Sequence, residues 1–140
     1  MNTKRKGNIA EVNAIAAFVE RGIPISVPFG DNERYDMIID LHKLLRVQCK
    51  LGHLDSGCVE FSTCSSYAHR GGKKKGYSED IDIFVVWFPP TRQLYVIPVE
   101  EACSTEMRLR IDQPLNGQKA NIHWASDYEI DEFIRKNTVT

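Results

Sequence analysis

Apolar positions near the start of the chain repeat with the period of an α-helix. Residues Ile9 to Val19 predict an amphipathic helix that ends before Gly22 and Pro24. Glu11 falls inside the apolar arc of this helix, and a carboxylate facing the core is costly unless a charged group meets it. Two explanations stay open: Glu11 reaches solvent at the edge of the arc, or it has a charged partner there. At about 100° per residue, the arc comprises Ile9, Val12, Ile15, Ala16, Phe18 and Val19.

The remainder of the chain follows the two-residue alternation of β-strands. IPISVPF predicts a short strand, and GDNER is rich in residues that turns prefer. YDMIIDL and KLLRVQCK predict a β-hairpin joined through residues 41–43. Further strands are expected at residues 57–69, 81–88, 93–99 and 107–111, and residues 70–76 as a basic, glycine-bordered loop. Residues 126–137 predict a closing helix with Ser126 as its N-cap and Glu129 in a capping box.

This order of elements predicts a single α/β or α+β domain over residues 1–140, with a mostly antiparallel meander after the first helix. Composition is that of an ordinary globular protein, and no apolar run approaches the roughly 18 residues needed to span a bilayer. The basic N-terminus has no cleavage site of small residues, so we expect a cytoplasmic protein without a membrane partner. Cys58, Cys64 and His69 do not have zinc-type spacing, and reduced, mostly buried thiols are expected.

The polar face of the hairpin carries candidate chemistry. Alternation turns Arg46, Gln48 and Lys50 to one face, and Leu45, Val47 and Cys49 to the other. A three-residue connection places Asp36 roughly opposite Gln48, with Lys50 as a diagonal neighbour. A carboxylate, an amide oxygen and an ammonium group would then meet on one patch.

Phosphodiester cleavage needs such a patch. Asp36, the Gln48 side-chain oxygen and the Cys49 backbone carbonyl are hard oxygen donors of the kind that Mg²⁺ prefers. Lys50 would stand beside a metal-activated water or the charge that builds on phosphate. If the first helix packs over this end of the hairpin, Glu11 could hold a metal-bound water or a second ion. The alternative, a hairpin whose polar face only meets solvent, stays open from these residues alone.

Net charge is −1, but its distribution is uneven. Residues 1–78 hold 12 Lys and Arg against 8 Asp and Glu, whereas residues 79–140 hold 6 against 11. A polarised chain can present a basic face to nucleic acid while it stays soluble. The charge pattern therefore permits a nucleic-acid partner without requiring one.

Nearly the whole chain resembles a known family. GNIAEVNAIAAFVERG, SVPFGDNERYDMIID, LLRVQCK and YSEDIDIFVVWFPPTRQLYVIPVEE are similar to the group I intron-associated branch of the PD-(D/E)XK endonucleases, and so is LRIDQPLNGQKANIHWASDYEI. The resemblance implies a restriction-endonuclease-like core, a central mixed β-sheet flanked by helices. It also implies homing-type cleavage of double-stranded DNA with Mg²⁺, for which Mn²⁺ is an expected substitute.

The resemblance assigns catalytic roles residue by residue. The helix Glu of the family falls on Glu11, the metal-binding Asp on Asp36 and the catalytic Lys on Lys50. Gln48 occupies the usual second acidic position, which removes a negative charge and should weaken metal affinity. Asp40 and Asp82 are alternative ligands that could replace it.

DNA contacts are expected mainly from the basic loop and the strand before it. Arg70, Lys73, Lys74 and Lys75 are candidates for phosphate contacts, joined by Ser62, Ser65, Ser66, Tyr77 and Arg46, with Lys4, Arg5 and Lys6 as a second basic arm. Tyr77 could instead be a core aromatic, and the basic loop could be a solvated charge run.

A subunit of this size has one active site and two strands to cut, so we expect a homo-oligomer, either a dimer or a tetramer. Two rival functions remain. A Holliday-junction resolvase would prefer branched DNA, and a catalytically inactive DNA-binding module would bind DNA without a metal.

Overall fold

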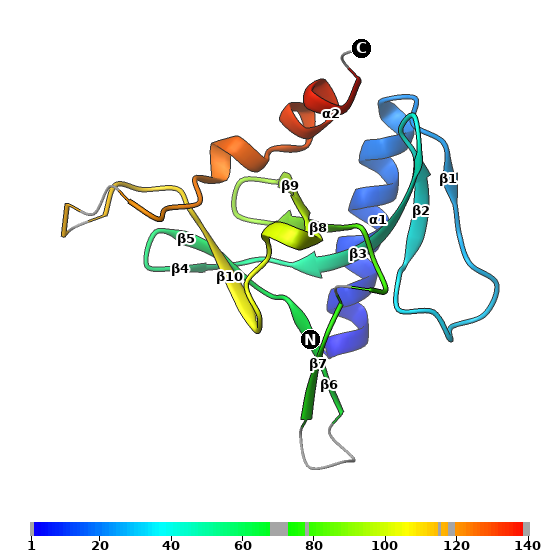
Figure 1. The fold of residues 1–140 in the computed structure, drawn as a ribbon, viewed down its shortest axis with the longest axis horizontal. Coiled ribbons are helices and arrows are strands. Elements are labelled where there is room, and N and C mark those ends of the chain that lie inside the picture. Colours follow the sequence, from blue (N-terminus) through cyan, green and yellow to red (C-terminus); the bar gives the residue numbers. More distant parts are fainter. Residues whose placement is uncertain (1, 68–72, 78, 115, 118–119, 139–140) are drawn as a thin grey trace.

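The computed structural model describes residues 2–67, 73–77, 79–114, 116–117 and 120–138, with residues 65–67 and 73–75 described by their backbone. A central sheet has the strand order β1-β2-β3-β8-β9, and helix α1 (Thr3–Glu20) covers one face of it (Figure 1). The bounds of these strands are Ile25–Ser26, Met37–Asp40, Leu44–Leu51, Ile83–Phe88 and Gln93–Pro98. A smaller sheet has the order β10-β5-β4, with bounds Glu106–Arg110, Cys58–Ser62 and His53–Asp55. The expected α+β architecture with a mixed central sheet is confirmed.

The central sheet is mixed because β3 and β8 run parallel. Val47 pairs with Ile83 and Leu51 with Trp87 in this ladder, while β1–β2, β2–β3 and β8–β9 are antiparallel. The meander expected from pattern alone is wrong at this point. After β3 the chain leaves the central sheet, forms β4 to β7, and returns as β8 beside β3 (Figure 1).

Helix α1 begins earlier than the sequence pattern predicted. Asn2 caps it, since its side-chain oxygen accepts a hydrogen bond from the Arg5 backbone N–H at 2.8 Å. The helix ends where Gly22 adopts a φ of 73°, a conformation that favours glycine. The described residues form no helix long and apolar enough to cross a membrane.

The buried face of α1 also differs from the predicted arc. Ala10, Ala14 and Phe18 are fully buried, whereas Val12 and Val19 are each 62% exposed. Phe18, Ile9 and Ile15 of the predicted arc do pack in the core. Hydropathy ranks valine above alanine, so the pattern wrongly included Val12 and Val19 and missed the alanines. A face of alanines brings the helix axis close to the sheet, and Phe18 then fills the space beyond.

Both faces of the central sheet are covered by apolar side chains. On one face, α1 packs against alternate residues of β2, β3, β8 and β9, together with Ile130 and Phe133 near the C-terminus. On the other face, Phe84, Val86 and Phe88 of β8 pack against β5 and β10. Every residue of β8 is therefore buried, as expected for a central strand covered on both sides.

The predicted hairpin is confirmed in both register and face. Met37 pairs with Val47 and Asp40 with Leu44, so three residues connect the strands. Leu45, Val47 and Cys49 are buried, whereas Arg46, Gln48 and Lys50 are partly exposed. Continuing the register by one pair places Asp36 opposite Gln48, as the alternation predicted.

The strand expected at residues 57–69 is two strands, β5 and β6 (Cys64–Tyr67). They are separated at Thr63, whose hydroxyl donates to the Cys103 carbonyl at 2.6 Å. The loop expected at residues 70–76 is partly a strand as well. β7 (Lys73–Gly76) pairs antiparallel with β6, and this pair projects from the body of the molecule (Figure 1).

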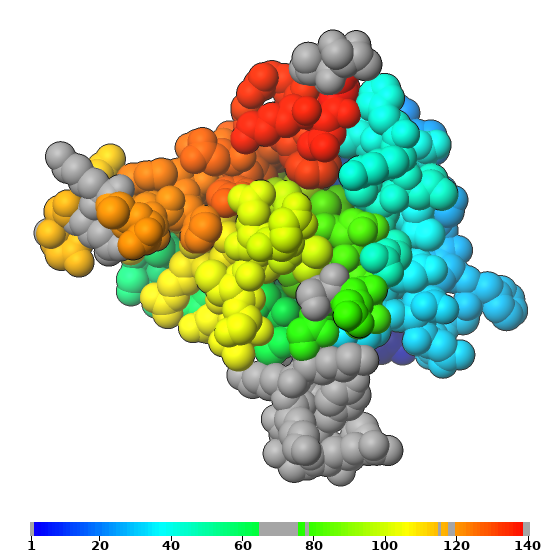
Figure 2. Space-filling view, in the orientation of Figure 1, coloured from blue at the N-terminus to red at the C-terminus, as the bar shows by residue number. Residues whose placement is uncertain are grey.

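The C-terminal helix α2 spans Ile130–Thr138, preceded by a 3-10 turn, η3 (Ala125–Tyr128). Ser126 therefore lies in the turn and does not cap α2. Glu129 has an extended backbone, and its carboxylate accepts a hydrogen bond from Gln93 at 3.0 Å, so the predicted capping box is absent. Figure 2 shows α2 and the segment around residue 100 on the same face, with residues 25–45 along one edge.

Candidate active site

Asp36 lies directly before β2 and is fixed by two backbone hydrogen bonds. Its own N–H donates to the Val47 carbonyl at 2.7 Å, and its carboxylate Oδ2 accepts from the Cys49 N–H at 2.8 Å. Because the N–H and C=O of one strand residue point to the same side, the Cys49 carbonyl also faces the side of Asp36. The structure therefore brings together two of the three oxygen donors that the sequence predicted.

Glu11 comes to this site from the other face of the sheet. α1 packs on the face that holds Met37, Val47 and Cys49, whereas Gln48 and Lys50 lie on the opposite face. Glu11 is partly buried and lies close enough to Asp36 for their charges to interact. Of the two explanations for Glu11 in the apolar arc, the structure supports a place beside a charged group, although that group is another carboxylate.

Glu11 and Asp36 both have raised pKa values. Burial raises the pKa of Glu11, and the negative charge of Asp36 raises it further. Burial likewise raises the pKa of Asp36, against the lowering effects of the Cys49 N–H hydrogen bond and the Lys50 charge. Two partly buried carboxylates with raised pKa values form a site in which a cation would relieve an electrostatic cost.

The donor set fits a hard divalent cation. Glu11 and Asp36 supply carboxylate oxygens, and the Cys49 carbonyl and the Gln48 amide oxygen are neutral donors of the same kind. Burial, with Asp36 and Glu11 close by, raises the pKa of the Cys49 thiol well above its usual range, so this residue would act through its backbone. Within the described residues no three His, Cys, Asp or Glu side chains gather as a metal site. A cation here would thus depend on two carboxylates, neutral oxygens and water.

An open hollow of about 220 Å³ borders Glu11 and Asp36. Two further acidic residues line it, Asp31 and Glu33, which the sequence analysis treated only as part of a turn. Their position three and five residues before Asp36 was the signal that could have drawn attention to them. The other lining residues are Val27, Pro28, Gly30 and Tyr35.

Lys50 is placed by contacts that the sequence did not reveal. Its Nζ donates to the Tyr77 hydroxyl at 3.3 Å and lies 4.8 Å from the centre of the Tyr77 ring. The positive charge of Lys50 also opposes the rise in the Asp36 pKa that burial causes. Asp36 therefore lies within range of charge interactions with both Glu11 and Lys50. Gln48 is partly buried, and its amide nitrogen is 3.4 Å from the Cys49 carbonyl.

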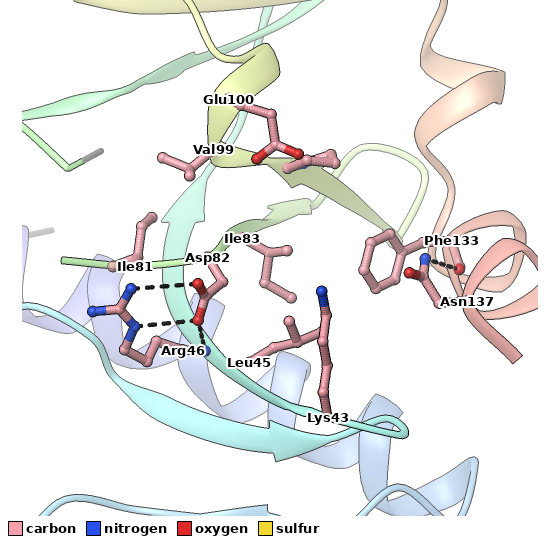
Figure 3. Close-up of a pocket in the computed structure, with 11 residues that line it drawn as sticks. Lys43, Leu45, Arg46, Ile81, Asp82, Ile83, Val99, Glu100, Phe133 and Asn137 are labelled. Atoms are coloured by element: carbon pink, nitrogen blue, oxygen red, sulfur yellow. Dashed lines mark hydrogen bonds and ion pairs between the residues drawn. The ribbon is translucent and has the colours of Figure 1, made fainter. Parts of the chain in front are cut away.

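Arg46, a candidate for DNA binding, forms an ion pair with Asp82, a candidate for metal binding. The Arg46 guanidinium donates to Asp82 at 3.2 and 3.3 Å, and the Arg46 backbone N–H donates to the same carboxylate at 2.7 Å (Figure 3). Burial acts to raise the pKa of Asp82, but these hydrogen bonds outweigh it and hold the pKa below the usual range. The geometry supports a structural ion pair. Asp40, the other alternative ligand, is exposed on β2.

The remaining DNA-binding candidates divide into two groups. The Ser62 hydroxyl donates to the Cys64 carbonyl at 2.8 Å, and Tyr77 is only 6% exposed and packs edge-on against Phe84. The geometry therefore supports structural roles for these two. The other group belongs to β6 and β7, where only the backbone is described: Ser65, Ser66, Lys73, Lys74 and Lys75. The described residues do not include His69 and Arg70. Lys4, Arg5 and Lys6 are exposed in the first turns of α1. Cys58 and Cys64 are buried free thiols.

Comparisons with known proteins identify the family of this chain. A sequence profile of the PD-(D/E)XK endonucleases matches residues 1–131, and the chain belongs to this family. The fold is similar to that of a solved structure described as a bacterial homing endonuclease, I-Ssp6803I, with a TM-score of 0.77 and 24% sequence identity. The match covers 97% of this chain and 95% of that one. A comparison with curated proteins gives no significant match.

Occupation of the site by Mg²⁺ should stabilise the protein. Because the folded-state pKa values of Glu11 and Asp36 are raised, their ionisation destabilises the fold at neutral pH, and this cost disappears as pH falls through those values. We expect Mg²⁺ at ten times its dissociation constant to add about 1.4 kcal/mol at pH 7. Thermal unfolding at pH 7 and pH 5, with and without Mg²⁺, measures the stabilisation and its dependence on pH.

Glu11→Gln provides the test variant, and Glu20→Gln on the exposed end of the same helix is its control. The Glu11 variant should unfold at a higher temperature than wild type without metal, and should gain less from Mg²⁺. An equal response to Mg²⁺ in both variants would contradict a metal site at Glu11.

Proposed function

We propose that this protein is a site-specific endonuclease of the homing type, which cuts double-stranded DNA with Mg²⁺ and acts as a homo-oligomer. The observation that supports the proposal is the position of Asp36, whose charge interacts with both Glu11 and Lys50. The homing character is supported by the likeness to the bacterial homing endonuclease. Membership of the PD-(D/E)XK endonucleases supports the chemistry.

Each residue of the site would have its own role in phosphodiester hydrolysis. When bound, the cation would polarise the scissile phosphate and lower the pKa of a water. Asp36 would hold it from the start of β2, and Glu11 would hold it, or a water bound to it, from α1. Lys50 would place a positive charge beside the phosphate oxygens where negative charge develops. The Cys49 carbonyl and Gln48 would add neutral donors, and the absence of a second strand carboxylate would weaken metal affinity.

The small size of the subunit supports a homo-oligomer. One subunit offers one such site, and a two-fold pair of subunits presents two sites to the two strands of a duplex. A tetramer would serve a longer target, because a small subunit contacts few base pairs.

Plasmids carrying candidate intron-insertion sites test the proposal, incubated with Mg²⁺ or with EDTA. Wild type should linearise one site in a metal-dependent manner. Lys50→Ala should slow cleavage about 10²–10³-fold, because a positioned charge in the transition state is lost. Lys43→Ala is the matched control, since Lys43 is exposed at the turn of the same hairpin, at the opposite end of β3 from Lys50.

Three other results would overturn the proposal in different ways. Cleavage of four-way junctions without cleavage of linear or supercoiled duplex would identify a Holliday-junction resolvase. DNA binding without cleavage under any divalent metal would identify an inactive DNA-binding module. Equal loss of activity in Lys43→Ala and Lys50→Ala would remove Lys50 from the chemistry.

A further inference from the structure

Tyr77 lies where it can control the position of Lys50. It follows β7 directly, and its carbonyl accepts the N–H groups of Asp80 and Ile81 at 2.9 and 3.2 Å, which closes a tight turn. Its side chain is 6% exposed and meets the ring of Phe84 edge-on, with ring centres 5.5 Å apart. The backbone and the ring of Tyr77 are therefore both fixed by the core of the second apolar face.

A second cation stacks on the Tyr77 ring. The Arg34 guanidinium lies 3.8 Å from the ring centre, and it also pairs with Asp80 at 2.7 Å. Arg34 is only 18% exposed. Because Asp80 belongs to the turn that Tyr77 closes, the Arg34 contacts fix the ring and its turn together. This arrangement accounts for an arginine in the loop before Asp36 without requiring a DNA contact from it.

Lys50 has the longest unbranched side chain of this group. A lysine side chain is a flexible stem with a point charge, and it loses precision unless something holds the charge. Tyr77 makes two contacts with the Lys50 ammonium group. Its hydroxyl oxygen lies 3.3 Å from Nζ, and the centre of its ring lies 4.8 Å from Nζ. A buried tyrosine that offers both constrains the direction as well as the distance of the ammonium group.

We infer that Tyr77 is a positioning residue for Lys50, held in turn by Arg34, and that it sets the cleavage rate without contacting DNA. This inference rests on the proposed function and goes beyond it, since it assigns a role to a residue outside the Glu11, Asp36 and Lys50 group. It also replaces the DNA-binding role that the sequence suggested for Tyr77.

Tyr77→Phe tests the inference in single-turnover cleavage with saturating enzyme and Mg²⁺. The ring and its packing remain while the hydroxyl is lost, so we expect the rate to fall about tenfold, the effect of one hydrogen bond to a charged group. The dissociation constant for uncut DNA in Ca²⁺ should stay within about twofold. The double variant Tyr77→Phe with Lys50→Ala should cut no more slowly than Lys50→Ala, because the two residues act through one contact.

Tyr95→Phe is the matched control. Tyr95 is also 6% exposed and belongs to the same apolar cluster, but it lies on β9, with β8 between it and Lys50. A similar slowing by Tyr95→Phe would assign the effect to a loosened core and overturn the inference. Wild-type rates in Tyr77→Phe, or a loss confined to DNA affinity, would overturn it as well. If wild type cuts no DNA, the proposed function fails first and the inference fails with it, whereas active wild type with an unaffected Tyr77→Phe rejects the inference alone.

Discussion

Replacing Asp36 with Asn is expected to lower the cleavage rate at least about 10³-fold, about 4 kcal/mol in activation free energy. Asn keeps an oxygen for the Cys49 N–H bond of 2.8 Å, so the local backbone should be retained. What is lost is the negative charge that a divalent cation needs. Single-turnover cleavage with Mg²⁺, together with DNA binding measured in Ca²⁺ and EDTA, separates chemistry from affinity.

Asp40→Asn is the control for this prediction. Asp40 ends β2, whereas Asp36 directly precedes this strand, and the two share the same alternation. Asp40 is exposed at the hairpin end, three residue pairs from the Met37–Val47 pair. Its loss should leave cleavage within about threefold of wild type, an effect of less than 1 kcal/mol. If Asp40→Asn were as inactive as Asp36→Asn, the metal would have to lie at the other end of the hairpin.

The largest expected loss of stability follows from Phe18→Ala. Phe18 is fully buried between α1 and the sheet, and truncating a buried Phe costs about 3–5 kcal/mol through lost transfer energy and the cavity left behind. A domain of ordinary stability has about 5–15 kcal/mol in total. The urea midpoint should therefore fall sharply, and the site should weaken with it because α1 carries Glu11.

Val19→Ala gives the contrast on the next residue of the same helix. Val19 is 62% exposed, so its truncation should change stability by no more than about 0.5 kcal/mol. Urea unfolding of both variants at one pH provides the comparison. Equal losses would mean that α1 packs through the valine face that hydropathy suggested.

Local alternation carries most of the information about the hairpin. Three connecting residues and a period of two were enough to place Asp36 opposite Gln48 and to separate Lys50 from Val47, and the structure has that register. The family resemblance then indicated the mixed sheet that alternation alone did not. These features depend on neighbours in sequence or on a pattern that spans the whole chain.

Other features depend on contacts that no local pattern encodes. The parallel pairing of Val47 with Ile83 joins strands separated by four others in the chain. The Lys50–Tyr77 contact joins β3 to the residue after β7. Nothing in the sequence pairs these two side chains, because they come close only when the chain folds. The burial of alanines on α1 was missed because alanine contributes little to a hydropathy pattern, although its small size decides how close the helix comes.

The alanine face of α1 sets a limit on sequence change in this protein. Ala10 and Ala14 are fully buried in the core between α1 and the sheet, so longer side chains there are expected to force the helix outwards. Val12 and Val19, on the outer side, carry no such limit. Natural variation along this helix should accordingly accept many residue types at positions 12 and 19 and only small side chains at positions 10 and 14, since a displaced helix would carry Glu11 away from Asp36.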